Sequence, residues 1–105
     1  MTNARIVLST AGSDEEAVAI ARELVEATLA ACVNIVPIIE SVYRWQGKVE
    51  QTTEWLLIIK TQASQVERVF NAIQGLHSYE LPECLVLDVS AGSEPYLSWI
   101  TENTA

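Results

Sequence analysis

Two long stretches rich in Val, Ile, Tyr, Trp and Thr lie in the middle of the chain, from Cys32 to Trp45 and onward to Thr61. Residues of these types are favoured in half-buried strands. Gly47 stands between the stretches and can adopt the positive φ that a short hairpin turn requires. The pattern therefore predicts one long β-hairpin, with a tight turn at Gln46 and Gly47.

This hairpin is too long for the domain that carries it. The fourteen residues from Cys32 to Trp45 would span roughly 46 Å at about 3.3 Å each. A chain of 105 residues, by contrast, folds into a body roughly 34 Å across. Pro37 lacks a ladder donor, so we expect a bend or bulge in the first arm. We expect a second subunit to cover the overhanging apolar tip, which consists of Val42, Tyr43, Trp45 and Val49.

Shorter periodic segments flank the hairpin. Before it, the apolar run from Arg5 to Thr10 predicts a strand. Apolar residues at helical spacing then predict a helix from Asp14 to Ala31, which begins with a capping box formed by Ser13 and Glu16. These segments place one strand and one helix ahead of the hairpin.

Three further elements follow the hairpin. Ser64 and Glu67 repeat the capping-box spacing and predict a second helix that ends near Gly75. The run from Cys84 to Val89 predicts a strand, and the segment from Ser93 to Pro95 is typical of a helix start, here of a short terminal helix.

The order of these elements predicts a single domain spanning residues 1–105 with an α+β fold. Two strand-helix-strand units with short connections fold most simply into a ferredoxin-like βαββαβ sandwich, with both helices on one face of an antiparallel sheet. The long hairpin and the short C-terminal helix are additions to this plan. Because both arms of the hairpin carry apolar residues on both sides, we expect the other face of the sheet to pack against further subunits.

Composition limits the partners of such a domain. Half of the residues are hydrophobic, which excludes disorder, and six Lys and Arg against fourteen Asp and Glu give a net charge of −8. This charge disfavours nucleic acid and anionic membranes and favours cations as small partners. No apolar stretch approaches the roughly 20 residues that cross a bilayer, so we expect a cytoplasmic protein in which Cys32 and Cys84 are free thiols.

The segment after the second predicted helix carries the residues most suited to metal binding. His77 is the only histidine, and Glu80, Glu83 and Cys84 follow it closely. Imidazole, carboxylate and thiolate together suit copper or zinc. The segment has neither a C-x-x-C motif nor a second histidine at helical spacing, so an alternative stays open in which its polar groups serve turns and subunit contacts.

Nothing in the sequence indicates catalysis. A pairing of His77 with Cys84 or Cys32 would lack a third orienting group and an oxyanion-hole motif, so we expect no enzymatic activity and no required cofactor. The aromatic residues allow two interpretations, a ligand-stacking cleft or packing in the core and between subunits. They are Tyr43, Trp45, Trp55, Tyr79, Tyr96 and Trp99.

Several blocks of the chain resemble the CutA proteins, the divalent-cation tolerance family. The matching blocks are LAACVNIVPIIESVYRWQGKVE, EWLLIIKT, HSYELPE with CLVLDV, and the closing YLSWI. The resemblance covers nearly the whole chain. It implies a ferredoxin-like homotrimer whose long hairpins reach onto neighbouring subunits and which contributes to tolerance of copper and other divalent metals.

The resemblance also implies a metal site, from which this chain departs. Copper ligands in the family have been suggested at a cysteine on the first strand and at two adjacent histidines after the second helix. The corresponding residues here are Ser9 and the pair Leu76-His77. We therefore expect weak binding of copper or another divalent cation by His77, helped by Glu80, Glu83 and Cys84.

A second functional hypothesis rests on the fold, which is similar to that of the PII signal-transduction trimers. In this alternative the chain senses a small molecule held between subunits, near residues 76–83 and the base of the hairpin. Trp55, Tyr79 and Glu80 are the candidate ligand contacts.

Overall fold

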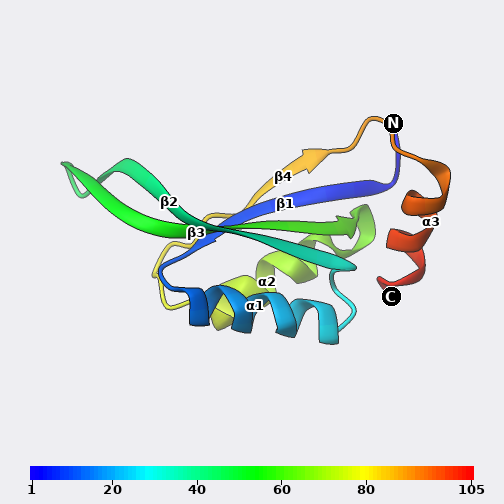
Figure 1. Cartoon of the computed structure of the whole chain (residues 1–105), viewed down its shortest axis with the longest axis horizontal. Coiled ribbons are helices and arrows are strands. Elements are labelled where there is room, and N and C mark those ends of the chain that lie inside the picture. Colours follow the sequence, from blue (N-terminus) through cyan, green and yellow to red (C-terminus); the bar gives the residue numbers. More distant parts are fainter.

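The computed structural model describes residues 1–105 and contains one antiparallel sheet with helices beneath it (Figure 1). Its four strands lie in the order β2-β3-β1-β4. The elements are β1 (Ala4–Ala11), α1 (Asp14–Glu26), β2 (Cys32–Trp45), β3 (Lys48–Gln62), the 3-10 turn η1 (Ala63–Gln65), α2 (Val66–Leu76), β4 (Leu85–Asp88) and α3 (Glu94–Glu102). The predicted α+β class is confirmed, and the succession of elements is consistent with the ferredoxin-like plan.

The hairpin turn lies where the sequence predicts it. Trp45 pairs with Lys48, and the two residues between them, Gln46 and Gly47, have φ angles of 50° and 81°. Two successive positive φ angles are the mark of the type I′ turn, whose twist matches that of the strands it joins. Gly47 adopts this conformation without steric cost, whereas Gln46 does so against the preference of a residue with a Cβ.

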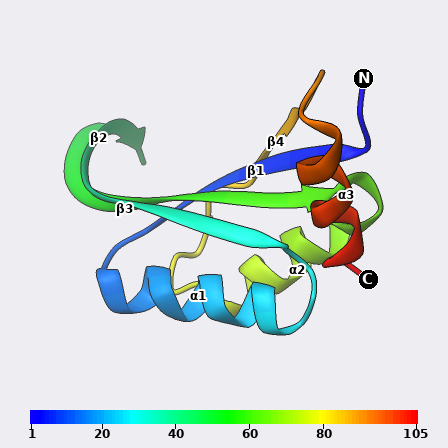
Figure 2. The same ribbon diagram turned by 45° about the vertical axis from the view of Figure 1, so that its right-hand side comes forward.

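The first arm of the hairpin contains the predicted bulge. The pairing of β2 with β3 shifts register between Val36 and Ile39, on either side of Pro37, and Ile38 has a φ of 58°. Because Pro37 has no N–H to donate to the ladder, a shift at this position sacrifices one hydrogen bond fewer than it would elsewhere. Beyond it the hairpin projects past the helices (Figures 1 and 2), and the molecule measures 44 × 26 × 22 Å.

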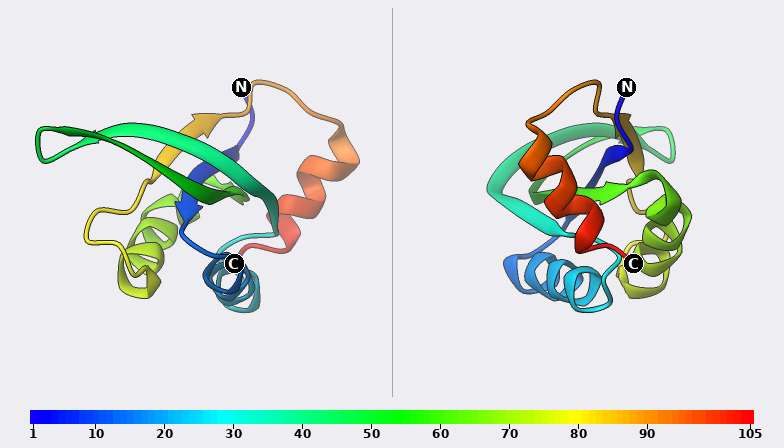
Figure 3. Two further views of the ribbon diagram at one scale, coloured as in Figure 1. Left: turned by 60° about the vertical axis from the view of Figure 1, so that its left-hand side comes forward. Right: turned by 90° about the vertical axis from the view of Figure 1, so that its right-hand side faces the viewer.

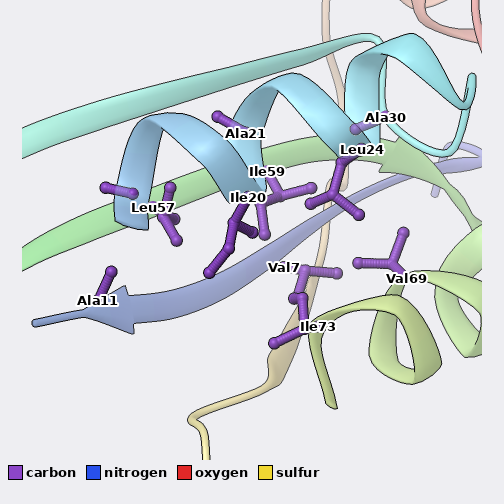
Figure 4. Close-up of a cluster of buried hydrophobic side chains, with 11 residues drawn as sticks. Val7, Ala11, Ile20, Ala21, Leu24, Ala30, Leu57, Ile59, Val69 and Ile73 are labelled. Carbon is purple, nitrogen blue, oxygen red and sulfur yellow. The ribbon is translucent and has the colours of Figure 1, made fainter. Parts of the chain in front are cut away.

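The main core lies between the sheet and the two helices α1 and α2 (Figure 4). Val7 of β1, with Leu57 and Ile59 of β3, meets Leu24 of α1 and Ile73 of α2, and all five are fully buried. The packing follows from the period of two in the strands and of 3.6 in the helices, which places these side chains on facing surfaces. Helix α3 lies at the opposite end from the hairpin tip (Figure 3) and packs Ile100 against Ala4 and Ala31.

Helix α1 ends five residues before the predicted end at Ala31, because the chain forms a Schellman motif there. Thr28 has a φ of 57°, its N–H donates to Val25, and the N–H of Leu29 donates to Leu24. These two bonds define the motif, which usually has glycine at the position of Thr28. Without a glycine, the sequence gives no stop signal.

The other helix boundaries are partly as predicted. The Ser13 hydroxyl accepts from the Glu16 N–H at 3.1 Å, which confirms this cap. The predicted cap at Ser64 is wrong: Ser64 lies inside the turn η1, and α2 starts at Val66 after Gln65, which makes no side-chain cap. Ser93 precedes α3 as predicted, also without a side-chain cap.

The strands differ from their predicted bounds by about one residue. Strand β1 is one residue longer at each end than predicted, and β4 is one residue shorter at each end than the run from Cys84 to Val89. Cys32 and Cys84 are both free, as predicted. None of the helices is long and apolar enough to cross a bilayer.

The face of the sheet away from α1 and α2 is largely uncovered. Ladder partners project on the same face, so the pairing of Leu8 with Leu85 and of Ile6 with Leu87 places all four there. Leu85 and Leu87 are exposed, as are Ile38, Val42 and Val49 along the hairpin, at 70%, 65% and 66%. The exposed apolar surface predicted from both arms of the hairpin is therefore present in the single chain.

Candidate functional site

His77 lies at the end of α2 and connects the following loop to β1. Its ring Nε2 donates to the Thr10 carbonyl at 2.5 Å, and Nδ1 accepts from the Tyr79 N–H at 3.0 Å. These two bonds require the neutral tautomer protonated at Nε2. The side chain is fully buried, so in the single chain neither nitrogen is available to a metal.

Glu16 of α1 stabilises the same loop from the other side. Its Oε2 accepts from the Ser78 N–H at 2.8 Å and lies 3.6 Å from Nδ1 of His77, while Oε1 accepts from the Gly12 N–H at 3.4 Å. Burial acts to raise the pKa of Glu16, but the hydrogen bonds from Ser78 and Gly12 outweigh it and hold the pKa below its ordinary value. The carboxylate is therefore ionised and anchors the loop.

Tyr79 joins this loop to the sheet. Its hydroxyl donates to Oε2 of Glu54 at 2.8 Å, and its ring lies 4.5 Å from that of His77. Burial, followed by the hydrogen bond to Glu54, raises the pKa of the phenol, which stays protonated as the donor. A Cβ on Gly12 would lie 3.0 Å from the Tyr79 hydroxyl, a tight contact that would require the tyrosine to shift.

A cleft of about 920 Å³ opens between this loop and the hairpin. Three of the four predicted metal ligands line it, namely Glu80, Glu83 and Cys84, and Glu54 lines it with them. His77 does not. The four predicted residues therefore divide into three that share a cleft and one that supports the loop beside it.

Burial and negative charge together set the electrostatics of the cleft. Burial, followed by the charge of Glu54, raises the pKa of Glu83. Burial and then the charge of Glu83 raise the pKa of the Cys84 thiol, which disfavours the thiolate that metals bind. Within the chain no group of three or more His, Cys, Asp and Glu side chains is arranged to hold a metal ion.

The two positions singled out by the family resemblance lie apart from the cleft. Ser9 is fully buried in β1, and its hydroxyl has no hydrogen-bond partner. It shares the helix-facing side of the strand with Val7 and Ala11, whereas Thr10, its neighbour, lines the cleft. Leu76 ends α2 with a half-exposed side chain.

The aromatic residues divide between the two interpretations left open by the sequence. Tyr43, Trp45 and Tyr79 line the cleft. Trp55 packs against the main core, and Tyr96 and Trp99 pack on each other in α3 with ring centroids 5.4 Å apart. The sequence interpretation missed Glu54, because a carboxylate within a strand carries no motif of its own.

Comparison with known proteins agrees with this geometry. The family described as "CutA1 divalent ion tolerance protein" matches residues 5–103 of the chain. The chain belongs to the CutA1 family. The match covers every strand and helix except the first residue of β1, so the CutA1 assignment rests on the whole fold and not on one motif.

Relatives of this CutA1 chain come from several kingdoms. The divalent-cation tolerance protein CutA of Thermus thermophilus is 46% identical over 94% of this chain and 96% of its own length. Human protein CutA is 43% identical over 90% of this chain, which spans 53% of the human protein's length. The chain thus spans nearly all of the bacterial relative and about half of the human one.

Solved CutA structures have the same fold. The crystal structure of CutA from Xylella fastidiosa has a TM-score of 0.97 and 40% identity, covering 99% of this chain and 100% of that one. The Thermus thermophilus protein has a TM-score of 0.95 and 44% identity, covering 97% and 99%. These values confirm the family that the sequence blocks indicated.

Proposed function

We propose that this CutA1 chain contributes to tolerance of divalent cations as a homotrimer that binds copper or another divalent cation weakly and catalyses no reaction. The observation that carries the proposal is the cleft in which Glu80, Glu83 and Cys84 lie with the buried carboxylate of Glu54. Oxygen and sulfur donors at one place suit borderline divalent metals. The family assignment supports the same function.

Weak binding follows from how few donors converge. No three ligating side chains of one chain are arranged around a common point, so a tight site would need donors from a second subunit. Direct ligation by His77 would require its ring to give up the hydrogen bond to Thr10 or to Tyr79. We therefore assign His77 to support of the loop and the cleft residues to the metal.

The homotrimer is supported by the exposed apolar surface. The face of the sheet away from α1 and α2 and the projecting hairpin present large side chains to water, including Ile38, Val42 and Val49. Contiguous apolar surface of this kind marks protein-protein contacts. A sheet face shared among copies removes it from water.

We further propose a cytoplasmic location. It rests on the two free thiols, Cys32 and Cys84, which suit a reducing compartment. Relatives differ in this respect: the Arabidopsis thaliana protein is named chloroplastic, and the Archaeoglobus fulgidus protein is described as periplasmic. The signalling alternative gains no support from the relatives named above.

Isothermal titration with Cu²⁺ and with Zn²⁺ tests the metal-binding part. We expect weak saturable heat in the unaltered protein, reduced in Glu83→Gln and retained in Glu15→Gln, a matched charge change on the exposed face of α1. His77→Ala is expected to lower stability more than it changes the heat per ion. Absence of heat with both metals, or equal heat in the two glutamate variants, would remove the cleft from the proposal.

A further inference from the structure

The cleft combines aromatic rings with buried negative charge, a combination that metal binding does not use. Tyr43 and Trp45 enter it from the hairpin, and Tyr79 enters from the loop after α2. In the single chain Tyr43 and Trp45 are 43% and 39% exposed, so part of each side chain is open to a ligand or to a second copy of the chain. Glu54 and Glu83 line the same cleft.

Glu54 is the least exposed charge in this group. Only 7% of the residue is exposed. One carboxylate oxygen accepts from Tyr79 at 2.8 Å; the other accepts no hydrogen bond, and the carboxylate forms no ion pair. No Lys, Arg or His lines the cleft. This second oxygen is not fully buried and is open to a ligand in the cleft. Carboxylates with so little exposure ordinarily have a cationic partner, and the single chain supplies none.

We propose that the cleft binds an organic monocation, an ammonium or guanidinium group, between the carboxylates of Glu54 and Glu83 and against the rings of Tyr43 and Trp45. Aromatic faces attract cations of these types, and a guanidinium group also matches the geometry of a carboxylate. A divalent metal gains little from the rings. The inference therefore stands apart from metal binding, and the two ligand classes can be titrated separately.

The cation has two possible sources with the same chemistry. One is a free small molecule that carries an amine or a guanidine. The other is a basic side chain from a second copy of the chain, since Arg44 and Lys48 are exposed at the hairpin tip. Both sources place one positive charge beside Glu54 and Glu83.

The test titrates ¹⁵N-labelled protein with tetramethylammonium chloride and with methylguanidinium chloride. Sodium chloride at the same ionic strength is the reference. We expect a saturable shift of the Trp45 indole N–H signal and none for Trp99, which lies on α3 outside the cleft. Glu83→Gln is expected to weaken binding about tenfold, and Glu15→Gln, on α1, to leave it unchanged.

Further variants separate the two sources and guard against misfolding. If a basic side chain of a second copy already fills the cleft, the shift appears only in Arg44→Gln or Lys48→Gln, which supports the site and identifies that source. Tyr43→Leu removes a ring without changing charge and is expected to weaken binding even if Glu83→Gln does not fold. No saturable shift in any of these proteins overturns the inference, as does equal affinity in the Glu83 and Glu15 variants.

Discussion

Replacing Tyr79 by phenylalanine removes a single hydroxyl and leaves the buried Glu54 carboxylate without its only hydrogen bond. Hydrogen bonds to charged groups contribute about 1.5–3 kcal/mol. The second oxygen of Glu54 accepts no bond within the chain, and Glu54 lines the open cleft, so water offsets part of the loss. We therefore expect Tyr79→Phe to lower the free energy of unfolding by about 1.5–2 kcal/mol. Urea titration measures this as a midpoint lower by about 1 M.

The control for this variant is Tyr96→Phe. The Tyr96 hydroxyl only accepts from Lys60 at 3.4 Å on the surface, so its loss is expected to change stability by less than about 0.5 kcal/mol. Repeating Tyr79→Phe in a Glu54→Gln background removes the buried charge, and the cost should shrink. A cost below about 0.5 kcal/mol, or the same cost in both backgrounds, would refute the reasoning.

The same hydroxyl gives the protein a dependence on alkaline pH. Burial, with the hydrogen bond to Glu54, raises the pKa of Tyr79 in the folded state. Above about pH 10, the ordinary value for tyrosine, the unfolded chain releases this proton while the folded chain retains it. The contribution of Tyr79 is therefore complete below pH 10 and is lost progressively above it. Tyr79→Phe should not show this loss of stability. The difference in free energy of unfolding between the variant and the unaltered protein should therefore narrow as the pH rises above about 10.

Four other variants test separate features of the structure. Gly12→Ala places a Cβ 3.0 Å from the Tyr79 hydroxyl and is expected to lower the free energy of unfolding by about 1–2 kcal/mol. Gly75→Ala in α2 meets no atom and is expected to raise the free energy of unfolding by about 0.5–1 kcal/mol, and urea titration measures both changes. Burial and the charge of Glu54 raise the pKa of Glu83 in the folded state. Ionisation of Glu83 therefore opposes folding once the pH rises above the ordinary pKa of a glutamate. Glu83→Gln should thus be more stable than the unaltered protein at pH 7 but equal to it at about pH 3.5. Trp45→Asp places a charge at the apolar hairpin tip and should weaken subunit assembly by several kcal/mol. Light scattering measures this effect, and Val18→Asp on α1 is the control.

The sheet and the hairpin were predictable because their signals are local and periodic. Alternating side chains fix which residues pair across a ladder, and Gly47 supplies the turn. Pro37 marked the bulge in the same way, since a residue without an N–H cannot continue a ladder. The end of α1 was not predictable, because Thr28 adopts the left-handed conformation that sequence patterns associate with glycine.

The site was only partly predictable, because its main contacts involve backbone groups and residues distant in the sequence. Glu80, Glu83 and Cys84 were found by residue type, and the structure brings them to one cleft. Glu54 comes from the middle of the hairpin, 25 residues before Tyr79, with which it pairs. No spacing rule connects two residues that meet only when the loop folds back over the sheet.

The role of His77 shows why residue type alone misjudges a ligand. An imidazole near carboxylates and a thiol suggests a metal site, yet this ring uses one nitrogen on the Thr10 carbonyl and the other on the Tyr79 N–H. Both bonds go to the backbone, so they position the loop that carries Tyr79 to Glu54. A ligand role predicts that His77→Ala reduces the number of ions bound at saturation. A supporting role predicts that the number of ions bound at saturation is unchanged, while their affinity and the stability of the protein fall. It also predicts a larger change in amide signals for the loop than for the rest of the chain. We expect the second pattern, because removing the ring leaves the cleft carboxylates in place but takes away the contacts that hold one wall of the cleft against β1.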